Sequence, residues 1–96
     1  MKSITIEREG RSLPLSIDTS ALDDWELLED ILIVDDADAG DNEKLNAIRR
    51  ALTRILGKEQ KKQLTAFLKG ERSRVPISEM VAALWEIFGA IKSLKK

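Results

Sequence analysis

One stretch decides the fold of this chain: Ile77-Ser-Glu-Met-Val-Ala-Ala-Leu-Trp-Glu-Ile-Phe-Gly-Ala-Ile91. On a helical wheel its apolar side chains fill an arc of about 200°, whereas a stripe of about 100° is enough to dock a surface helix on a core. The arc, which continues to the end of the chain, contains Ala83, Leu94, Ile87, Met80, Ile91, Leu84, Ile77, Phe88, Val81 and Trp85. Such a helix is either the central helix of a small bundle or shares its apolar face between the core and a partner.

The width of this arc predicts two roles for its residues. The residues expected to hold the core are Ile77, Leu84, Phe88 and Ile91. The candidate partner contacts at the margins of the arc are Trp85, Val81, Ile87 and Leu94. Trp25, in an earlier apolar stretch, is a further candidate, because Trp is enriched at interface hot spots. For each of these side chains taken singly, a place in the core is the alternative.

The rest of the chain predicts one β-hairpin and three more helices. Residues 3–17 alternate apolar and polar side chains on both sides of Glu9-Gly10-Arg11, as two paired strands do. Helices are predicted over residues 20–35, 42–56, 58–69 and 77–94, with Ser20 and Asp41 as N-caps and Gly57 ending the second. Residues 1–96 are therefore predicted to be one mostly α domain, a small four-helix bundle-like domain preceded by a short N-terminal β-hairpin.

The composition excludes several kinds of chemistry. The 96 residues include no Cys, no His and no Tyr, so disulfides, thiolate metal sites and His-assisted nucleophiles are absent. The acidic run at residues 35–41 lacks the spacing of a calcium loop, because the sixth position counted from Asp36 is Asp41 where glycine is needed. We expect no catalytic, metal-binding or cofactor-binding residues and no enzymatic activity. The chain also has no signal-peptide core and no run long enough to cross a bilayer, which predicts a cytoplasmic protein.

The charge is strongly divided along the chain. Residues 1–43 carry 13 acidic and 3 basic side chains, whereas residues 44–96 carry 4 acidic and 13 basic side chains. One interpretation is that acidic and basic helices lie side by side and neutralise each other. The other is head-to-tail self-association, or binding of a charged partner through one exposed end.

A basic face on the third predicted helix and the loop after it is the candidate for such a partner. Its residues are Lys58, Lys61, Lys62, Lys69, Arg72 and Arg74. This face allows an alternative function, that of a small helical regulatory or nucleic-acid-associated protein. Against it, the helix that would read a DNA groove, residues 77–91, is apolar and carries no Arg, Asn or Gln, and the sequence pI of about 5.5 is low for a nucleic-acid-binding domain.

The order of features from Leu22 to Ile91 resembles the small tail assembly chaperones encoded by long-tailed phages and prophages. The matching features are a Trp-bearing first helix, an acidic loop, a helix that ends in a Leu-Gly-x-Glu-Gln stretch, a Leu-rich helix, a polar loop and a final apolar helix. The residues that carry them here are Trp25-Glu-Leu-Leu28, Ile55-Leu-Gly-Lys-Glu-Gln60, Leu64 to Leu68, Arg74-Val-Pro-Ile-Ser-Glu-Met80 and Leu84-Trp-Glu-Ile-Phe88.

This resemblance implies a non-enzymatic role in the cytoplasm of the host bacterium. Members of the family are helical proteins that coat the long tape-measure protein, keep it soluble and draw in tail-tube subunits. The expected partners are therefore a tape-measure protein, a tail-tube protein and further copies of the chain itself. Such work requires reversible contacts and an apolar surface for an amphipathic partner helix.

Overall fold

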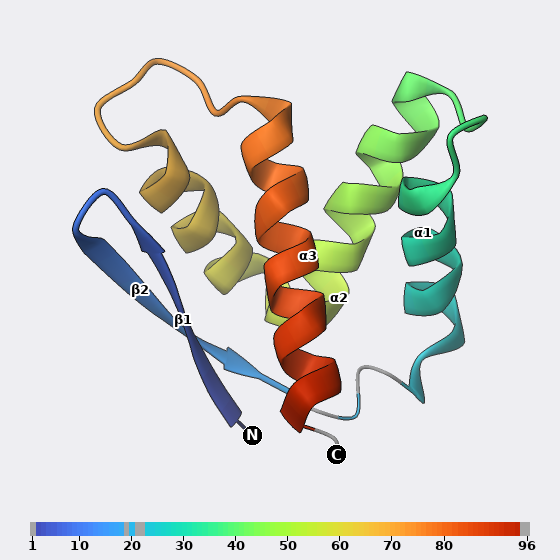
Figure 1. Ribbon diagram of the computed structural model, residues 1–96, viewed down its shortest axis with the longest axis horizontal. Helices are drawn as coiled ribbons and strands as arrows, with labels where there is room; N and C mark the ends of the chain where they lie inside the picture. Colours follow the sequence, from blue (N-terminus) through green and yellow to red (C-terminus); the bar gives the residue numbers. More distant parts are fainter. Residues whose placement is uncertain (1, 19, 21–22, 95–96) are drawn as a thin grey trace.

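The computed structural model describes residues 2–18, 20 and 23–94 of the chain. In these residues a two-stranded antiparallel hairpin, β1 (Lys2–Arg8) and β2 (Arg11–Ile17), precedes the helices α1 (Trp25–Asp35), α2 (Asp41–Lys69) and α3 (Ile77–Leu94). Figure 1 shows the hairpin at one end of the molecule and α1 at the other, with α2 spanning the distance between them and α3 lying across its middle. The predicted fold class, mostly helical with an N-terminal hairpin, is confirmed.

The hairpin is closed by the two residues Glu9 and Gly10. Arg8 pairs with Arg11, and the φ angles of Glu9 and Gly10 are 52° and 77°. Positive φ at both turn positions matches the right-handed twist of the strands. The alternation of the two strands then places one apolar face on the helices, where Ile6, Leu15 and Ile17 are almost completely buried.

Helix α1 begins five residues later than predicted. Its N-cap is Asp24, whose carboxylate accepts hydrogen bonds from the backbone N–H groups of Glu26 at 2.9 Å and Leu27 at 3.3 Å. The prediction that Ser20 caps this helix was wrong. Its backbone N–H and hydroxyl instead donate to Asp18 Oδ1, at 2.9 and 2.7 Å, in a local turn before the helix.

Helix α2 contains both the second and the third predicted helices, divided by a bend at Gly57. This residue has φ 81° and ψ 165°, whereas the residues on both sides are helical. That region of backbone conformation is open almost only to glycine. Gly57 therefore ends the first arm, as predicted, but the second arm starts again at once in a new direction.

The core lies where the two arms of α2, helix α3 and the hairpin meet. Its largest fully buried side chains are Ile6, Leu15, Ile17, Leu27, Leu52, Leu64, Leu84, Ile87 and Ile91. Two expectations for α3 were wrong. Ile87, a candidate partner contact, has no exposed surface, and Ile77, expected in the core, is 57% exposed. The buried face of α3 is centred on Ala83 and Ile87. Ile77 lies in the first turn of the helix, which no other described element covers.

We predict that Gly57→Ala lowers the free energy of unfolding by about 1–3 kcal/mol, because alanine must adopt a backbone conformation reserved for glycine. No atom lies within 4 Å of the position of the added Cβ, so crowding contributes nothing. The matched control is Gly89→Ala in the regular helix α3, where the open position should give a gain of about 0.5–1 kcal/mol. Chemical denaturation of the two variants checks the opposite signs.

Candidate functional site

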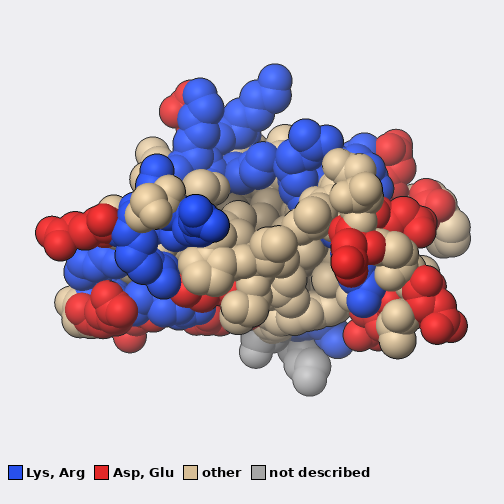
Figure 2. Space-filling view, turned by 90° about the horizontal axis from the view of Figure 1, so that it is seen from above, with Lys and Arg blue, Asp and Glu red and all other residues tan. Residues whose placement is uncertain are grey.

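A groove of about 790 Å³ follows the outer side of α2. All of its lining residues come from this one helix, on both sides of the bend: Arg49, Arg50, Thr53, Arg54, Lys58, Lys61, Lys62, Thr65, Ala66 and Lys69. Seven of these ten side chains are basic and none is acidic. Figure 2 shows Lys and Arg side chains along one side of the molecule and at the end opposite α1, and acidic side chains at both ends, including the end where α1 lies.

The groove exists because of residue spacing and the bend together. Its basic residues recur every three or four positions, which places them on one face of a helix. The bend at Gly57 turns the two halves of this face toward a common space. Small side chains form the floor, and the hydroxyls of Thr53 and Thr65 donate to the backbone carbonyls of Arg49 and Lys61, both at 2.9 Å. The small side chains and the alkyl stems of the Lys and Arg residues together give the groove a mostly apolar surface beneath a basic rim.

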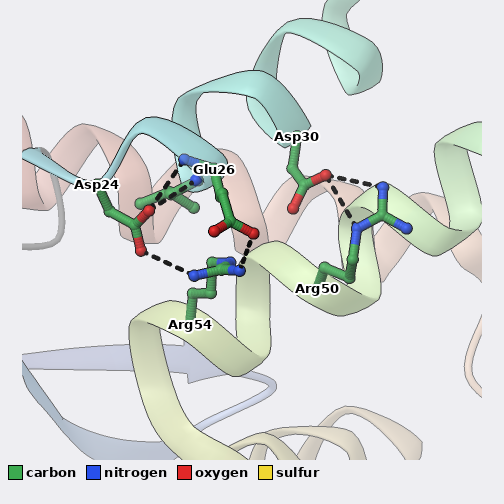
Figure 3. Close-up of polar contacts among 6 residues, drawn as sticks. Asp24, Glu26, Asp30, Arg50 and Arg54 are labelled. Carbon is green, nitrogen blue, oxygen red and sulfur yellow. Dashed lines mark hydrogen bonds and ion pairs between the residues drawn. The ribbon is translucent and has the colours of Figure 1, made fainter.

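Two of the basic residues are neutralised by α1. Arg50 donates from Nε and Nη2 to Asp30 Oδ1, at 3.0 and 2.8 Å, and only 5% of Asp30 is exposed. Arg54 donates to Asp24 at 3.1 Å and also to Glu26. Figure 3 shows both arginines reaching from α2 to these carboxylates. These pairs fasten α1 to the first arm of α2, as the side-by-side interpretation of the divided charge predicts.

The contacts shift the pKa of groups on both helices. The hydrogen bond to Asp30 raises the pKa of Arg50. Burial alone would raise the pKa of Asp24, but hydrogen bonds from Leu27, Arg54 and Glu26 lower it overall. Because the pKa of Asp24 is lowered in the folded state, its contribution to stability is present above the unfolded pKa and is lost as pH falls through the folded pKa.

The other basic side chains of the groove have no acidic partner in the described part of the chain. Arg49 donates to the amide oxygen of Asn46 at 3.1 Å, and no described acid forms an ion pair with Lys58, Lys61, Lys62 or Lys69. Since these groups are solvated and unpaired, the groove keeps an attraction for anionic groups. Its apolar floor adds an attraction for a nonpolar side chain.

An apolar pocket of about 170 Å³ opens beside the groove. Its lining residues are Leu45, Ile48, Arg49, Leu52, Lys61, Val75, Ile77 and Met80. Arg49 and Lys61 belong to both the pocket and the groove, so the two spaces adjoin. A cavity of about 150 Å³ with apolar walls holds benzene in another protein. This pocket therefore has room for one apolar side chain, and the exposed Ile77 and Leu45 stand at its rim.

The structure brings together only part of the predicted basic face. Lys58, Lys61, Lys62 and Lys69 line the groove, but Arg72 and Arg74 do not. Arg72 instead lies in the loop after α2 and binds both carboxylate oxygens of Glu79 at 2.8 Å, which lowers the pKa of Glu79. Arg74 is exposed in the same loop.

Sequence reasoning missed three residues of the groove, which are Arg49, Arg50 and Arg54 on the first arm. Their three- and four-residue spacing continues through Gly57 to Lys58, Lys61 and Lys62, and this continuity is the signal that could have found them.

The candidate partner contacts are also separated by the structure. Trp25 is 73% exposed at the start of α1. Trp85 and Val81 are partly buried against the core, and the ring of Trp85 meets Phe88 edge-on at 6.2 Å between centroids. Ile87 is buried, as described above, and the side chain of Leu94 lies outside the described residues. Trp25 is thus the most exposed of the candidates whose side chains the structure describes.

Metal clusters and membrane-spanning helices are both absent from the described residues. Among them, no group of three or more Asp or Glu side chains is arranged to hold a metal ion. None of the described helices combines the length and the apolar character needed to cross a membrane. Comparison of the chain with protein-family models, with curated proteins and with solved structures finds no match.

We predict that Arg50→Ala lowers the free energy of unfolding by about 1–3 kcal/mol, because it leaves the buried carboxylate of Asp30 without its partner. Arg49→Ala is the matched control. Arg49 is the neighbouring residue, and among the described residues its side chain donates only to the exposed Asn46, so the change should stay within about 0.5 kcal/mol. Equal losses in the two variants, measured by urea denaturation, would contradict the anchoring role of the Arg50–Asp30 pair.

Proposed function

We propose that this chain is a non-enzymatic tail assembly chaperone that holds helical segments of a tape-measure protein in the groove of α2. In this proposal it works in the cytoplasm of the host bacterium and also draws tail-tube subunits to the growing assembly. The order of sequence features supports membership of the tail assembly chaperone family, and the groove supports binding of a helical segment.

The single observation that carries this proposal is the groove itself. It combines unpaired basic side chains on its rim, a mostly apolar floor and an adjoining pocket for one apolar side chain. An amphipathic helix with an apolar stripe between Asp or Glu side chains complements all three features. The apolar anchor supplies most of the affinity, and the charges supply orientation and a fast encounter.

The exposed rim also keeps such binding reversible. Ion pairs between solvated side chains contribute about 0–1 kcal/mol each, and salt weakens them. A chaperone must release its partner before the particle is complete. The cations of the groove are exposed, and the adjoining pocket admits a single apolar side chain. Such a site releases its partner more readily than a large interface from which water is excluded.

A second candidate function is association with nucleic acid, favoured by the unpaired Lys58, Lys61, Lys62 and Lys69. The acidic end of the molecule and the ion pair between Arg72 and Glu79 weigh against it. One measurement distinguishes the two functions. Retention on double-stranded DNA that falls steeply with salt favours nucleic-acid binding, and retention of an acidic amphipathic peptide without DNA retention favours the chaperone.

We predict that the gene next to this one encodes a very long helical protein, and that a segment of that protein binds the chain. Lys58→Glu/Lys62→Glu should weaken this binding at least about tenfold, because reversing two exposed charges costs about 1 kcal/mol each. The control Lys44→Glu/Lys92→Glu makes the same charge change away from the groove and should bind as the wild type does. Calorimetric titration measures both.

Two results would contradict the proposed function. One is a gene without a long helical neighbour. The other is a neighbouring product that stays soluble alone and does not bind the wild-type chain.

A further inference from the structure

Helix α1 carries an apolar stripe that the rest of the molecule leaves uncovered. Trp25 is 73% exposed and Leu32 is 68% exposed, with the partly buried Leu28 between them. These residues are three and four positions apart and therefore share one face of the helix. The opposite face, with Leu27 and Ile31, packs against the core. A large aromatic side chain with this exposure is a candidate anchor for an interface.

Two acidic side chains that accompany this stripe are unpaired in the described part of the chain. Asp30 and Glu26 bind the arginines of α2, whereas no described basic residue forms an ion pair with Glu29 or Asp35. Glu29 lies one turn from both Trp25 and Leu32, and Asp35 lies one turn beyond Leu32. The exposed side of α1 is thus an apolar stripe with acidic neighbours.

The groove of α2 has the complementary pattern. Among the described residues, the groove cations without an acidic partner are Arg49, Lys58, Lys61, Lys62 and Lys69, and the apolar pocket adjoins them. A molecule's own α1 does not fill this groove, because Arg50 and Arg54 hold α1 by its other side. Among the described residues, the charges left without an ion pair are therefore acidic beside the stripe of α1 and basic along the groove of α2.

We propose that the groove of one copy binds α1 of a second copy, with Trp25 seated in the pocket formed by Leu45, Ile48 and Leu52. Charge complementarity selects a second copy as the occupant. A nucleic acid could also contact the basic rim. However, it has no apolar side chain to fill the pocket, and the acidic end of the molecule would repel it. Because the contacting surfaces differ, one contact leaves a free α1 and a free groove, which allows longer assemblies.

The binding of α1 in the groove also has a consequence for the proposed chaperone function, and this consequence rests on that function. A tape-measure helix and the α1 of a second copy would occupy the same groove, so the two binding events exclude each other. In the absence of a tape-measure helix, copies of the chain would associate with one another. Binding of the tape-measure helix in the groove would then separate them. Trp25 would matter only for the association of copies, whereas Lys58 and Lys62 would matter for both.

The experiment is sedimentation of purified chains, whose monomer has a mass of 10.8 kDa, over a range of concentration and salt. The wild type should form species heavier than the monomer that dissociate as salt rises. Trp25→Ala should weaken this association at least about tenfold, as loss of a central aromatic anchor does. Lys58→Glu/Lys62→Glu should weaken it similarly, and the control Lys44→Glu/Lys92→Glu should not.

Mixing the two defective variants gives the sharpest result. Trp25→Ala keeps an intact groove, and Lys58→Glu/Lys62→Glu keeps an intact α1, so their mixture should form a complex that neither forms alone. Leu32→Ser is a second exposed variant of the α1 stripe, and circular dichroism of all variants shows that they are folded. The proposal is overturned by a monomeric wild type, by unchanged association of Trp25→Ala and Leu32→Ser, or by a mixture that stays monomeric.

The same variants distinguish this proposal from the proposed function. Trp25→Ala should bind the long helical neighbour at least as tightly as the wild type does, because the competing α1 has been weakened. Binding of that neighbour by a wild type that never self-associates overturns only the binding of α1 in the groove of a second copy. Self-association with the expected variant pattern, without binding of the neighbour, overturns only the chaperone function.

Discussion

The bend at Gly57 is the constraint on which the rest of the structure depends. A straight helix from Asp41 to Lys69 could contact either α1 or the hairpin, but it could not enclose a core with both. The bend sends the first arm along α1 and the second arm along β2, and α3 closes the angle between them (Figure 1). The cost is one residue in a conformation that suits glycine. The gain is a core shared by every element and a groove on the outer side of α2.

The divided charge of the sequence is resolved partly within the molecule. Arg50 and Arg54 pair with acidic residues of α1, and this uses the charges that face each other between the two helices. Burial of Asp30 makes its pairing with Arg50 a condition for correct packing of α1, since an unpaired buried carboxylate is costly. The side-by-side interpretation therefore explains the inner charges. The outer ones, at Lys58, Lys61 and Lys62, form no ion pair with any described residue.

Much of the fold could be predicted from the sequence because its signals are local. The period-2 strands, the turn at Gly10 and the break at Gly57 each depend on a few neighbouring residues. The start of α1 could not be predicted as reliably, since Ser20 and Asp24 are both good N-caps and the choice between them depends on how Leu27 and Ile31 meet the core. A helical wheel likewise gives the width of an apolar face but not its direction. For this reason Ile77 was expected in the core and Ile87 at a partner contact, whereas the structure exposes Ile77 and buries Ile87.

The side chain of Gln60 has a consequence for the hairpin. Its amide accepts from the backbone N–H of Ser16 at 2.6 Å and donates to the carbonyl of Ser16 at 2.8 Å. Pro14, two residues earlier on the same outer edge of β2, has no N–H to offer. A free strand edge is a template on which another chain can add a strand and begin to aggregate. On β2 that template is interrupted at two successive positions, Pro14 and Ser16, so this edge of the small sheet is protected against strand addition.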